Sequence, residues 1–200
     1  MNKKALIFIS AGLLCVMAAL ALYIYNTVQS GNAAEASAEI VSALSEQIAA
    51  EGESAASFPA DNPDREMPSL EYEGNGYVGI LSLPSLGLEL PVGDALSYEA
   101  LQSTPCLYSG SIYSRDMVIG AHNYDSHFGG ISSLGIGDRV IFTDVENHVF
   151  VCEVIDIETL RPEQNDVLTE KQNGSIWDLT LFTCNYSGSE RVTVRCGIVK

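Results

Sequence analysis

The chain of 200 residues has few basic residues. Lysine and arginine together number 10 against 26 aspartates and glutamates, which gives a formal net charge of −16. A surface of this sign repels a phosphate backbone, so the composition argues against nucleic acid as a partner. Cysteine is scarce as well: five residues are too few for a disulfide scaffold, and their odd number leaves at least one unpaired.

Several common catalytic and metal-binding motifs are also missing. The sequence has no glycine-rich phosphate loop, no paired CxxC pattern and no HExxH, so nucleotide-binding and zincin functions lack support. We therefore assign no cofactor and no metal site. Hydrophobic residues nevertheless make up 46% of the chain and charged residues only 18%, which leaves enough apolar surface for a packed core.

One long apolar run lies at the N-terminus. Residues 5–25 carry no formal charge, and a helix of that length spans about 31 Å, enough for the hydrocarbon core of a bilayer. Lys3 and Lys4 favour a cytoplasmic N-terminus and an exported remainder. The alternative is a cleaved signal peptide, but the run is longer than a typical signal core. We therefore expect a cytoplasmic start and a single-pass membrane anchor over residues 1–26.

An acidic stalk rich in alanine, serine, glutamate and proline is expected over residues 27–72. Within it a narrow apolar stripe recurs at helical spacing, formed by Ile40, Val41, Leu44 and Ile48. Such a stripe either binds a partner or belongs to a solvated spacer, and we favour the spacer. Three prolines then stiffen an acidic, extended segment. A fragment that begins near Tyr72 is accordingly expected to fold and to act without the stalk.

Residues 73–200 have the pattern of a mostly β domain. Short apolar or alternating runs are separated by Gly, Pro, Asn and Asp, which is typical of a barrel or a sandwich. Helical signals are brief, at residues 98–103 and 131–134, and residues 143–147 are expected to form a hairpin loop. The predicted strands are Tyr77–Leu83, Leu86–Val92, Met117–His122, Arg139–Thr143, His148–Ile157, Asp178–Cys184 and Arg191–Val199.

Cys184 is the centre of the predicted chemistry. It ends an apolar run just before a polar loop at residues 185–190, and the next run opens with Arg191. If the two runs pair as a hairpin, Cys184 and Arg191 lie opposite each other with Cα atoms ~4.5–5.5 Å apart. Arg195 lies on the same face but about 13 Å further along, so we expect it to be a structural charge.

A guanidinium beside a thiol suits nucleophilic acyl transfer. It favours the thiolate and donates hydrogen bonds to a developing oxyanion. The leaving amine still requires an acid and a base, and histidine has a suitable pKa. His122 ends an apolar run at a strand-to-loop junction, as Cys184 does, whereas we expect His127 and His148 to be surface residues. Zinc held by His122, His127 and Cys184 is an alternative without an evident fourth ligand.

At these residues the sequence resembles the sortase family. Thr180–Cys184 matches the TLxTC signature, Arg191 matches the arginine that opens the following strand, and His122 matches the family histidine. The resemblance covers about Tyr77–Lys200. It implies an eight-stranded β-barrel with short helices, located on the outer face of a Gram-positive-type cell. Ala121 stands where many relatives have glycine, a conservative change that leaves the site intact.

The resemblance also implies a reaction. Cys184 would attack a sorting-signal protein of the LPxTG type after the threonine, and an amine from a peptidoglycan precursor or a pilin would resolve the thioester. His122 would act as general acid and base, Arg191 would stabilise substrate and oxyanion, and Thr183 is a candidate substrate contact. Because the sequence stops at Lys200 without a second membrane span, a housekeeping or class D-like enzyme is expected.

The other cysteines of the domain, Cys106, Cys152 and Cys196, are expected to be small core residues. A disulfide between Cys152 and Cys196 is the less favoured alternative. The competing hypothesis for the whole chain is a membrane-tethered β-barrel binding module with a degenerate, non-catalytic site. It accounts for the anchor, the stalk and the barrel, but it leaves the three matched site residues unexplained.

Overall fold

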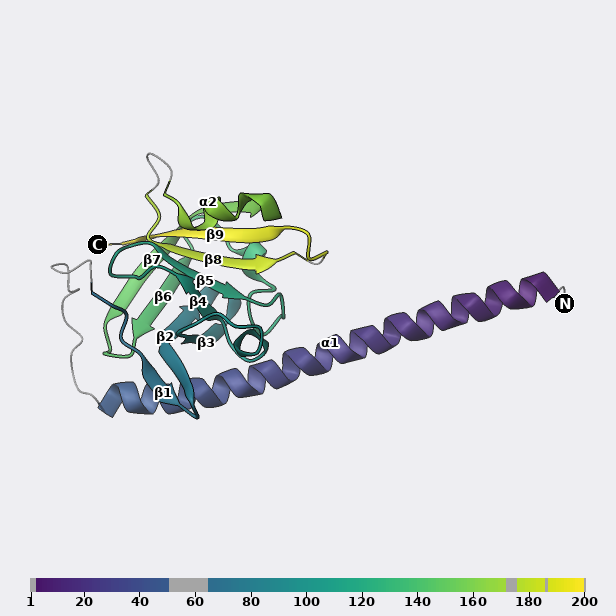
Figure 1. Cartoon of the computed structure of the whole chain (residues 1–200), viewed down its shortest axis with the longest axis horizontal. Helices are drawn as coiled ribbons and strands as arrows, with labels where there is room; N and C mark the ends of the chain where they lie inside the picture. The colour runs from purple at the N-terminus through teal and green to yellow at the C-terminus, as the bar shows by residue number, and fades with distance from the viewer. Residues whose placement is uncertain (1–2, 51–64, 172–175, 186, 200) are drawn as a thin grey trace.

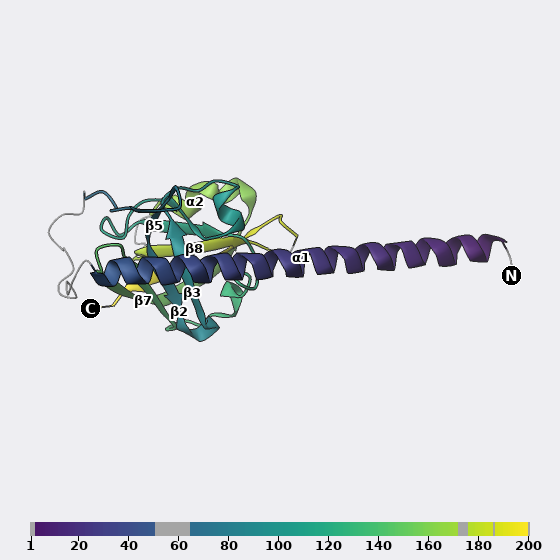
Figure 2. The same ribbon diagram turned by 90° about the horizontal axis from the view of Figure 1, so that it is seen from below.

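The computed structural model describes residues 3–50, 65–171, 176–185 and 187–199. One long helix, α1 (Lys3–Ala50), lies against a β-barrel with its C-terminal half, while its N-terminal half extends away from the barrel (Figure 1). The helix runs straight across one side of the barrel (Figure 2) and contacts β1, β2 and β3, whose bounds are given below. Most of the predicted proline-stiffened segment lies outside the described residues.

Eight strands close into a barrel, and a ninth extends it. The sheet has the order β1-β2-β3-β4-β5-β8-β9-β7-β6, and β2 also pairs with β6, which closes the barrel and leaves β1 outside it. The strands are β1 (Leu70–Tyr72), β2 (Asn75–Leu83), β3 (Leu88–Gly93), β4 (Cys106–Ser109), β5 (Met117–Ala121), β6 (Arg139–Asp144), β7 (Val149–Leu160), β8 (Leu179–Cys184) and β9 (Arg191–Ile198). The short helices are η1 (Pro84–Leu86), η2 (Ala100–Gln102), η3 (Ile131–Ser133), η4 (Pro162–Gln164) and α2 (Asn165–Thr169).

The strand predictions are confirmed within a few residues at their ends, and the barrel is the expected eight-stranded one. The hairpin between β6 and β7 is present, since the Asp144 N–H donates to the His148 carbonyl at 3.1 Å. The pattern missed β1 and β4 because these strands have only three and four residues, too few to show an alternation. The two predicted helical segments are the short helices η2 and η3.

Large apolar side chains fill the barrel. Phe128, Phe142 and Phe150 are at most 1% exposed, and burying such a side chain contributes roughly 1.5–3 kcal/mol relative to leaving it in water. Cys106, Cys152 and Cys196 are fully buried, as predicted for small core residues. All are free thiols, so the alternative disulfide is not formed.

The apolar stripe of the predicted stalk packs against the barrel. Leu44 and Ile48 on α1 are 0% and 4% exposed, and with the rest of the stripe they cover Tyr77 and Ile80 of β2. The preference for a solvated spacer is therefore wrong for this segment. The reason is that β2 is apolar on both faces, with alternate side chains turned into the barrel and toward α1.

The same packing changes the expectation for a shortened fragment. A chain that begins at Tyr72 would leave Tyr77 and Ile80 exposed to water, and it would lose the part of β1 that pairs with β2. A fragment that begins at Tyr72 is therefore expected to be less stable than the full-length protein. The division of the chain at residues 26 and 72 stays a prediction.

Candidate active site

Cys184 and Arg191 lie directly opposite each other. Cys184 is the last residue of β8 and Arg191 the first of β9, and the antiparallel register pairs them as the sequence predicted. The loop between them is held by a hydrogen bond from the Asn185 N–H to the Glu190 carbonyl at 2.9 Å. Among the residues that the structure describes, nothing accepts a hydrogen bond from Nη1 of Arg191, although this atom is buried. Arg191 therefore stands directly across the ladder from Cys184 and has a guanidinium donor with no partner in the described part of the chain.

His122 lies at the same end of the barrel as Cys184. It follows the last residue of β5, which runs parallel to β8 with Ala121 opposite Thr183. Because neighbouring strands lie about 4.8 Å apart, the residues that come next, His122 and Cys184, emerge side by side. Thr183 is 3% exposed, and its hydroxyl donates to the Ala121 carbonyl at 2.8 Å, which ties the two strand ends together.

Two tyrosines flank the His122 ring. Tyr98 meets it edge-on, with ring centroids 6.2 Å apart, and Tyr124 lies tilted against it at 5.1 Å. Burial lowers the pKa of His122 below that of an exposed histidine. The His122 imidazole is therefore neutral in a larger fraction of the molecules near pH 7, and in that form it can accept a proton. Sequence reasoning missed both tyrosines, although Tyr124 stands only two residues after His122.

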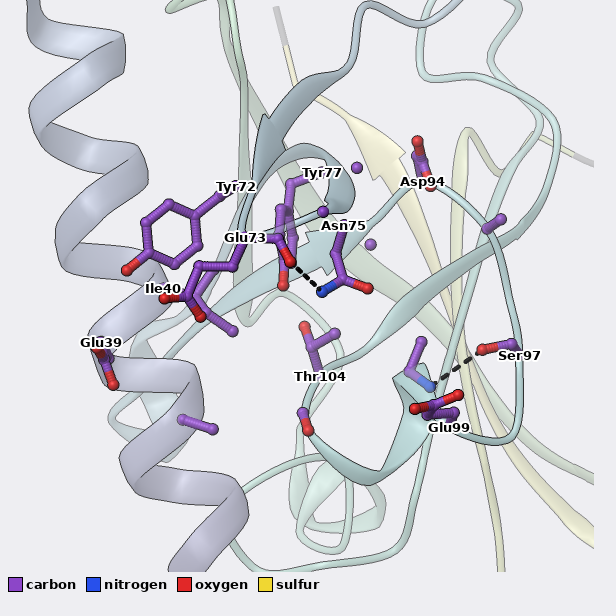
Figure 3. A pocket seen from close by; sticks show the side chains of 17 residues that line it. Glu39, Ile40, Tyr72, Glu73, Asn75, Tyr77, Asp94, Ser97, Glu99 and Thr104 are labelled. Atoms are coloured by element: carbon purple, nitrogen blue, oxygen red, sulfur yellow. Dashed lines mark hydrogen bonds between the residues drawn. The ribbon is translucent and has the colours of Figure 1, made fainter.

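A small cavity of about 80 Å³ adjoins Cys184. Thr183, Asn185 and Val192 contribute to its lining from the two site strands and their loop. Cavities of about 500 Å³ lie elsewhere in the structure. One is the groove between α1 and the hairpin of β1 and β2, lined by acidic and aromatic side chains that include Glu39 and Tyr72 (Figure 3). Because it contains none of the three matched residues, we do not assign it to the reaction.

His148 and His127 differ from the surface residues that were expected. The Nδ1 atom of His148 lies 2.9 Å from Oδ2 of the buried Asp144, so this ring fastens the hairpin of β6 and β7. His127 is fully buried between its own loop and α1. The surface prediction is wrong for His127 because the loop pattern gave no sign of the helix that covers it. Within the described ranges, no three His, Cys, Asp or Glu side chains are grouped to hold a metal ion.

The buried imidazole of His127 makes the fold sensitive to acid. Burial lowers its pKa from 6.5 to about 4. As the pH falls through this range, the unfolded chain takes up a proton that the native chain does not, so stability decreases, by about 3 kcal/mol in all. We expect the free energy of unfolding to decrease less between pH 6.5 and 4 in His127→Leu than in the wild type. Urea denaturation at several pH values measures this, and parallel curves for the two proteins would contradict it.

Arg195 serves the structure, as predicted. It is 4% exposed, and its guanidinium stacks on the Trp177 ring with 4.8 Å from Cζ to the ring centroid. All three of its nitrogens have partners, which are Glu158, Thr180 and the carbonyls of Val167 and Leu168. The side chain thereby holds α2 and Trp177 against the outer face of β9, four residues along the strand from Arg191.

Replacing Arg195 by lysine should lower stability without changing turnover. Lysine cannot reproduce the planar fork, and each buried acceptor left unsatisfied costs about 1–3 kcal/mol. We expect a lower urea midpoint, with kcat of the folded enzyme within roughly twofold of the wild type, in line with a residue beyond reach of the reacting carbonyl. Denaturation and peptide cleavage measured at one low temperature separate the two effects. A large decrease in kcat at unchanged stability would exchange the roles of Arg191 and Arg195.

Known structures share this barrel. A sortase D5 transpeptidase from Clostridium perfringens superposes with a TM-score of 0.61 at 15% identity, covering 83% of this chain and 99% of that chain. Sortase C from Streptococcus pneumoniae gives 0.60 at 18% identity, with 81% and 97% covered. A lid mutant of sortase A from Corynebacterium diphtheriae gives 0.56 at 21% identity, with 82% and 96% covered. The fold is therefore the one that these sortase structures share.

The sequence itself matches the profile of the sortase domain over residues 81–199, more than half of the chain. The chain belongs to the sortase family. Membership and fold together support a cysteine transpeptidase function in general, as the motif around Cys184 predicted. No curated protein matches the sequence.

Proposed function

We propose that the protein cleaves an LPxTG-type sorting signal through a thioester on Cys184 and transfers the product to an amine. One observation carries this proposal, namely the strand register that gathers Cys184, His122 and Arg191 at one edge of the barrel. Among the similar structures, sortase C of Streptococcus pneumoniae is described in terms of its pilin substrate specificity. A sorting-signal protein is accordingly the substrate class that we propose here.

In the first half of the reaction, neutral His122 accepts the proton of the Cys184 thiol. The sulfur attacks the carbonyl carbon of the threonine, and the oxyanion accepts a hydrogen bond from the guanidinium of Arg191. A preorganised donor of this kind stabilises the transition state by about 2.7–4 kcal/mol. The C–N bond then breaks, His122 returns its proton to the leaving amine, and a thioester remains on Cys184.

In the second half, an amine from a peptidoglycan precursor or a pilin attacks the thioester. A new C–N bond forms and the C–S bond breaks. His122 takes the proton from the attacking nitrogen and passes it to the sulfur, which restores the starting state. Thr183 lines the cavity beside Cys184, and we propose it as a substrate contact there, although its hydroxyl is already bonded to Ala121.

The proposed location is the outer face of the cell membrane. Helix α1 is long and apolar enough to span a bilayer, and we assign residues 5–25 to the span, with the N-terminus in the cytoplasm. Ser30, about 8 Å further along the helix at ~1.5 Å per residue, accepts a hydrogen bond from the Ser126 hydroxyl at 2.8 Å. The loop that follows His122 therefore lies next to the proposed membrane surface. The β8 arrow in Figure 1 ends on the side from which α1 extends toward its N-terminus.

Alkylation of Cys184 separates an enzyme from a binding module with a degenerate site. Burial raises the pKa of Cys106 to about 11 and that of Cys152 to about 12, so both should be inert. We expect iodoacetamide at pH 7 to modify Cys184 faster than these two by at least on the order of 10², since the thiolate fraction changes about tenfold per pKa unit.

The control for this experiment is His122→Ala, made in a Cys15→Ser background. The Cys15→Ser change removes the exposed thiol on α1. An enzyme site predicts that this variant slows the alkylation of Cys184, whereas a degenerate site predicts the same rate with and without His122. Tandem mass spectrometry of the digested protein identifies the modified cysteine.

A further inference from the structure

His127 lies where three segments of the chain meet. Its side chain is fully buried, and its Nδ1 atom has no hydrogen-bond partner among the described residues. The segments around it are α1, the end of η2 and the loop that begins at His122. The proposed reaction does not use this ring, so its presence in so confined a place calls for another explanation.

Ser37 of α1 is the polar partner that reaches His127 from the helix. Ser37 is 1% exposed, and its hydroxyl donates to the Ser103 carbonyl just after η2, at 2.8 Å. The hydroxyl oxygen lies 3.4 Å from Nε2 of His127. Because the serine proton is already used, the tautomer that fits carries its hydrogen on Nε2 and donates toward Ser37. One serine thereby connects the helix with both other segments.

The backbone around His127 also fixes the loop that carries His122. The His127 N–H donates to the Tyr124 carbonyl at 2.9 Å, and the Phe128 N–H donates to the His122 carbonyl at 3.2 Å. The Tyr124 ring lies between the two imidazoles, 5.1 Å from His122 and 5.6 Å from His127. A displacement of His127 would therefore move the ring that packs on His122.

The segment that carries the second aromatic neighbour of His122, Tyr98, is also hydrogen-bonded to Ser37. Tyr98 meets the His122 ring edge-on, and it stands in the segment that continues through η2 to Ser103. The Ser103 carbonyl accepts the Ser37 hydroxyl. Tyr98 and Tyr124 thus both belong to segments that Ser37 joins to α1.

We propose that α1 is part of the framework that orients His122, and that Ser37 and His127 are its positioning residues. The proposal rests on the proposed function of His122. This gives the helix a second role beside that of the proposed membrane anchor. It also keeps in place the two tyrosines that pack on His122. A displacement of about 1 Å in a catalytic group is enough to cost up to 10²-fold in rate.

The first test compares two Ser→Ala changes on one helix in the full-length chain. Ser37→Ala removes the connecting hydroxyl, whereas Ser45→Ala removes an exposed hydroxyl from the same helix and serves as the matched control. We expect Ser37→Ala to lower kcat for an LPxTG-type peptide roughly tenfold with KM within about twofold, because the change affects chemistry rather than binding. Ser45→Ala should match the wild type.

The second test separates hydrogen bonding from packing at His127. In His127→Gln the side-chain amide nitrogen takes the place of Nε2, whereas His127→Leu keeps a similar volume without a donor. We expect the glutamine variant to retain kcat within about threefold and the leucine variant to lose roughly tenfold. Circular dichroism melting confirms that each variant is folded at the assay temperature.

A readout without substrate keeps this proposal apart from the proposed function. The pH profile of Cys184 alkylation reports the state of His122 whether or not any peptide is cleaved. We expect the midpoint of that profile to shift in Ser37→Ala and His127→Leu but not in Ser45→Ala or His127→Gln. Unchanged profiles and an unchanged kcat in all four variants would overturn the proposal, as would equal losses in the glutamine and leucine variants.

Discussion

Replacing Cys184 by alanine is expected to reduce the cleavage of an LPxTG-type peptide to background. The thioester cannot form without the sulfur, and the proposed mechanism gives neither His122 nor Arg191 a nucleophilic step. In other enzymes with a covalent mechanism, loss of the nucleophile costs on the order of 10⁶ in kcat. Release of a fluorophore from the quenched peptide measures the remaining rate.

The matched controls for this experiment are Cys106→Ala and Cys152→Ala. Both thiols are fully buried in the barrel. They lie on β4 and β7, whereas the site is built on β5, β8 and β9. Their removal should reduce stability modestly and leave kcat of the folded protein within a few-fold of the wild type. If Cys184→Ala cleaved the peptide as fast as the wild type, the enzyme interpretation would have to be abandoned.

Replacing Arg191 by lysine is the second change with a large expected effect. Lysine keeps the positive charge but presents a single ammonium in place of a planar fork, so it cannot hold the substrate and the oxyanion at once. Removing one oxyanion donor typically costs about 2.7–4 kcal/mol, or roughly 10²–10³ in rate. We expect kcat/KM for the peptide to decrease by that factor while the melting temperature stays close to that of the wild type.

The control for Arg191→Lys is Arg195→Lys, the same substitution on the same face of β9. The two arginines differ in their partners: the buried Nη1 atom of Arg191 has none among the residues that the structure describes, whereas each guanidinium nitrogen of Arg195 is bonded. One change should therefore reduce activity and the other stability. A reversal of these two results would place the oxyanion donor on Arg195.

The register of the site was predictable because it depends on residues that are close in sequence. A cysteine and an arginine at the two ends of one short loop have to face each other once their strands pair, and the structure has this pairing. His122 was harder to predict as a site residue, because β5 is distant in sequence from β8. It was found because both residues end apolar runs at a strand-to-loop junction, which is where parallel neighbours bring side chains together.

The contact between α1 and the barrel could not be found in the same way. The spacing of Ile40, Leu44 and Ile48 revealed an apolar stripe, but the periodicity of one segment does not tell which distant surface covers it. The outer face of β2 provides that surface through Tyr77 and Ile80. His127 was misjudged for the same reason, because its burial depends on Ser37, which lies 90 positions earlier.

Mass spectrometry of the acyl-enzyme tests the central claim most directly. The full-length protein is mixed with an LPxTG-type peptide in the absence of an acceptor amine, quenched in acid and digested. We predict an added mass equal to the acyl group of the peptide up to its threonine (that fragment less one water), located on the fragment that contains Cys184 and absent from Cys184→Ala. Cleavage of the peptide without this adduct, or an adduct on another cysteine, would contradict the proposed mechanism.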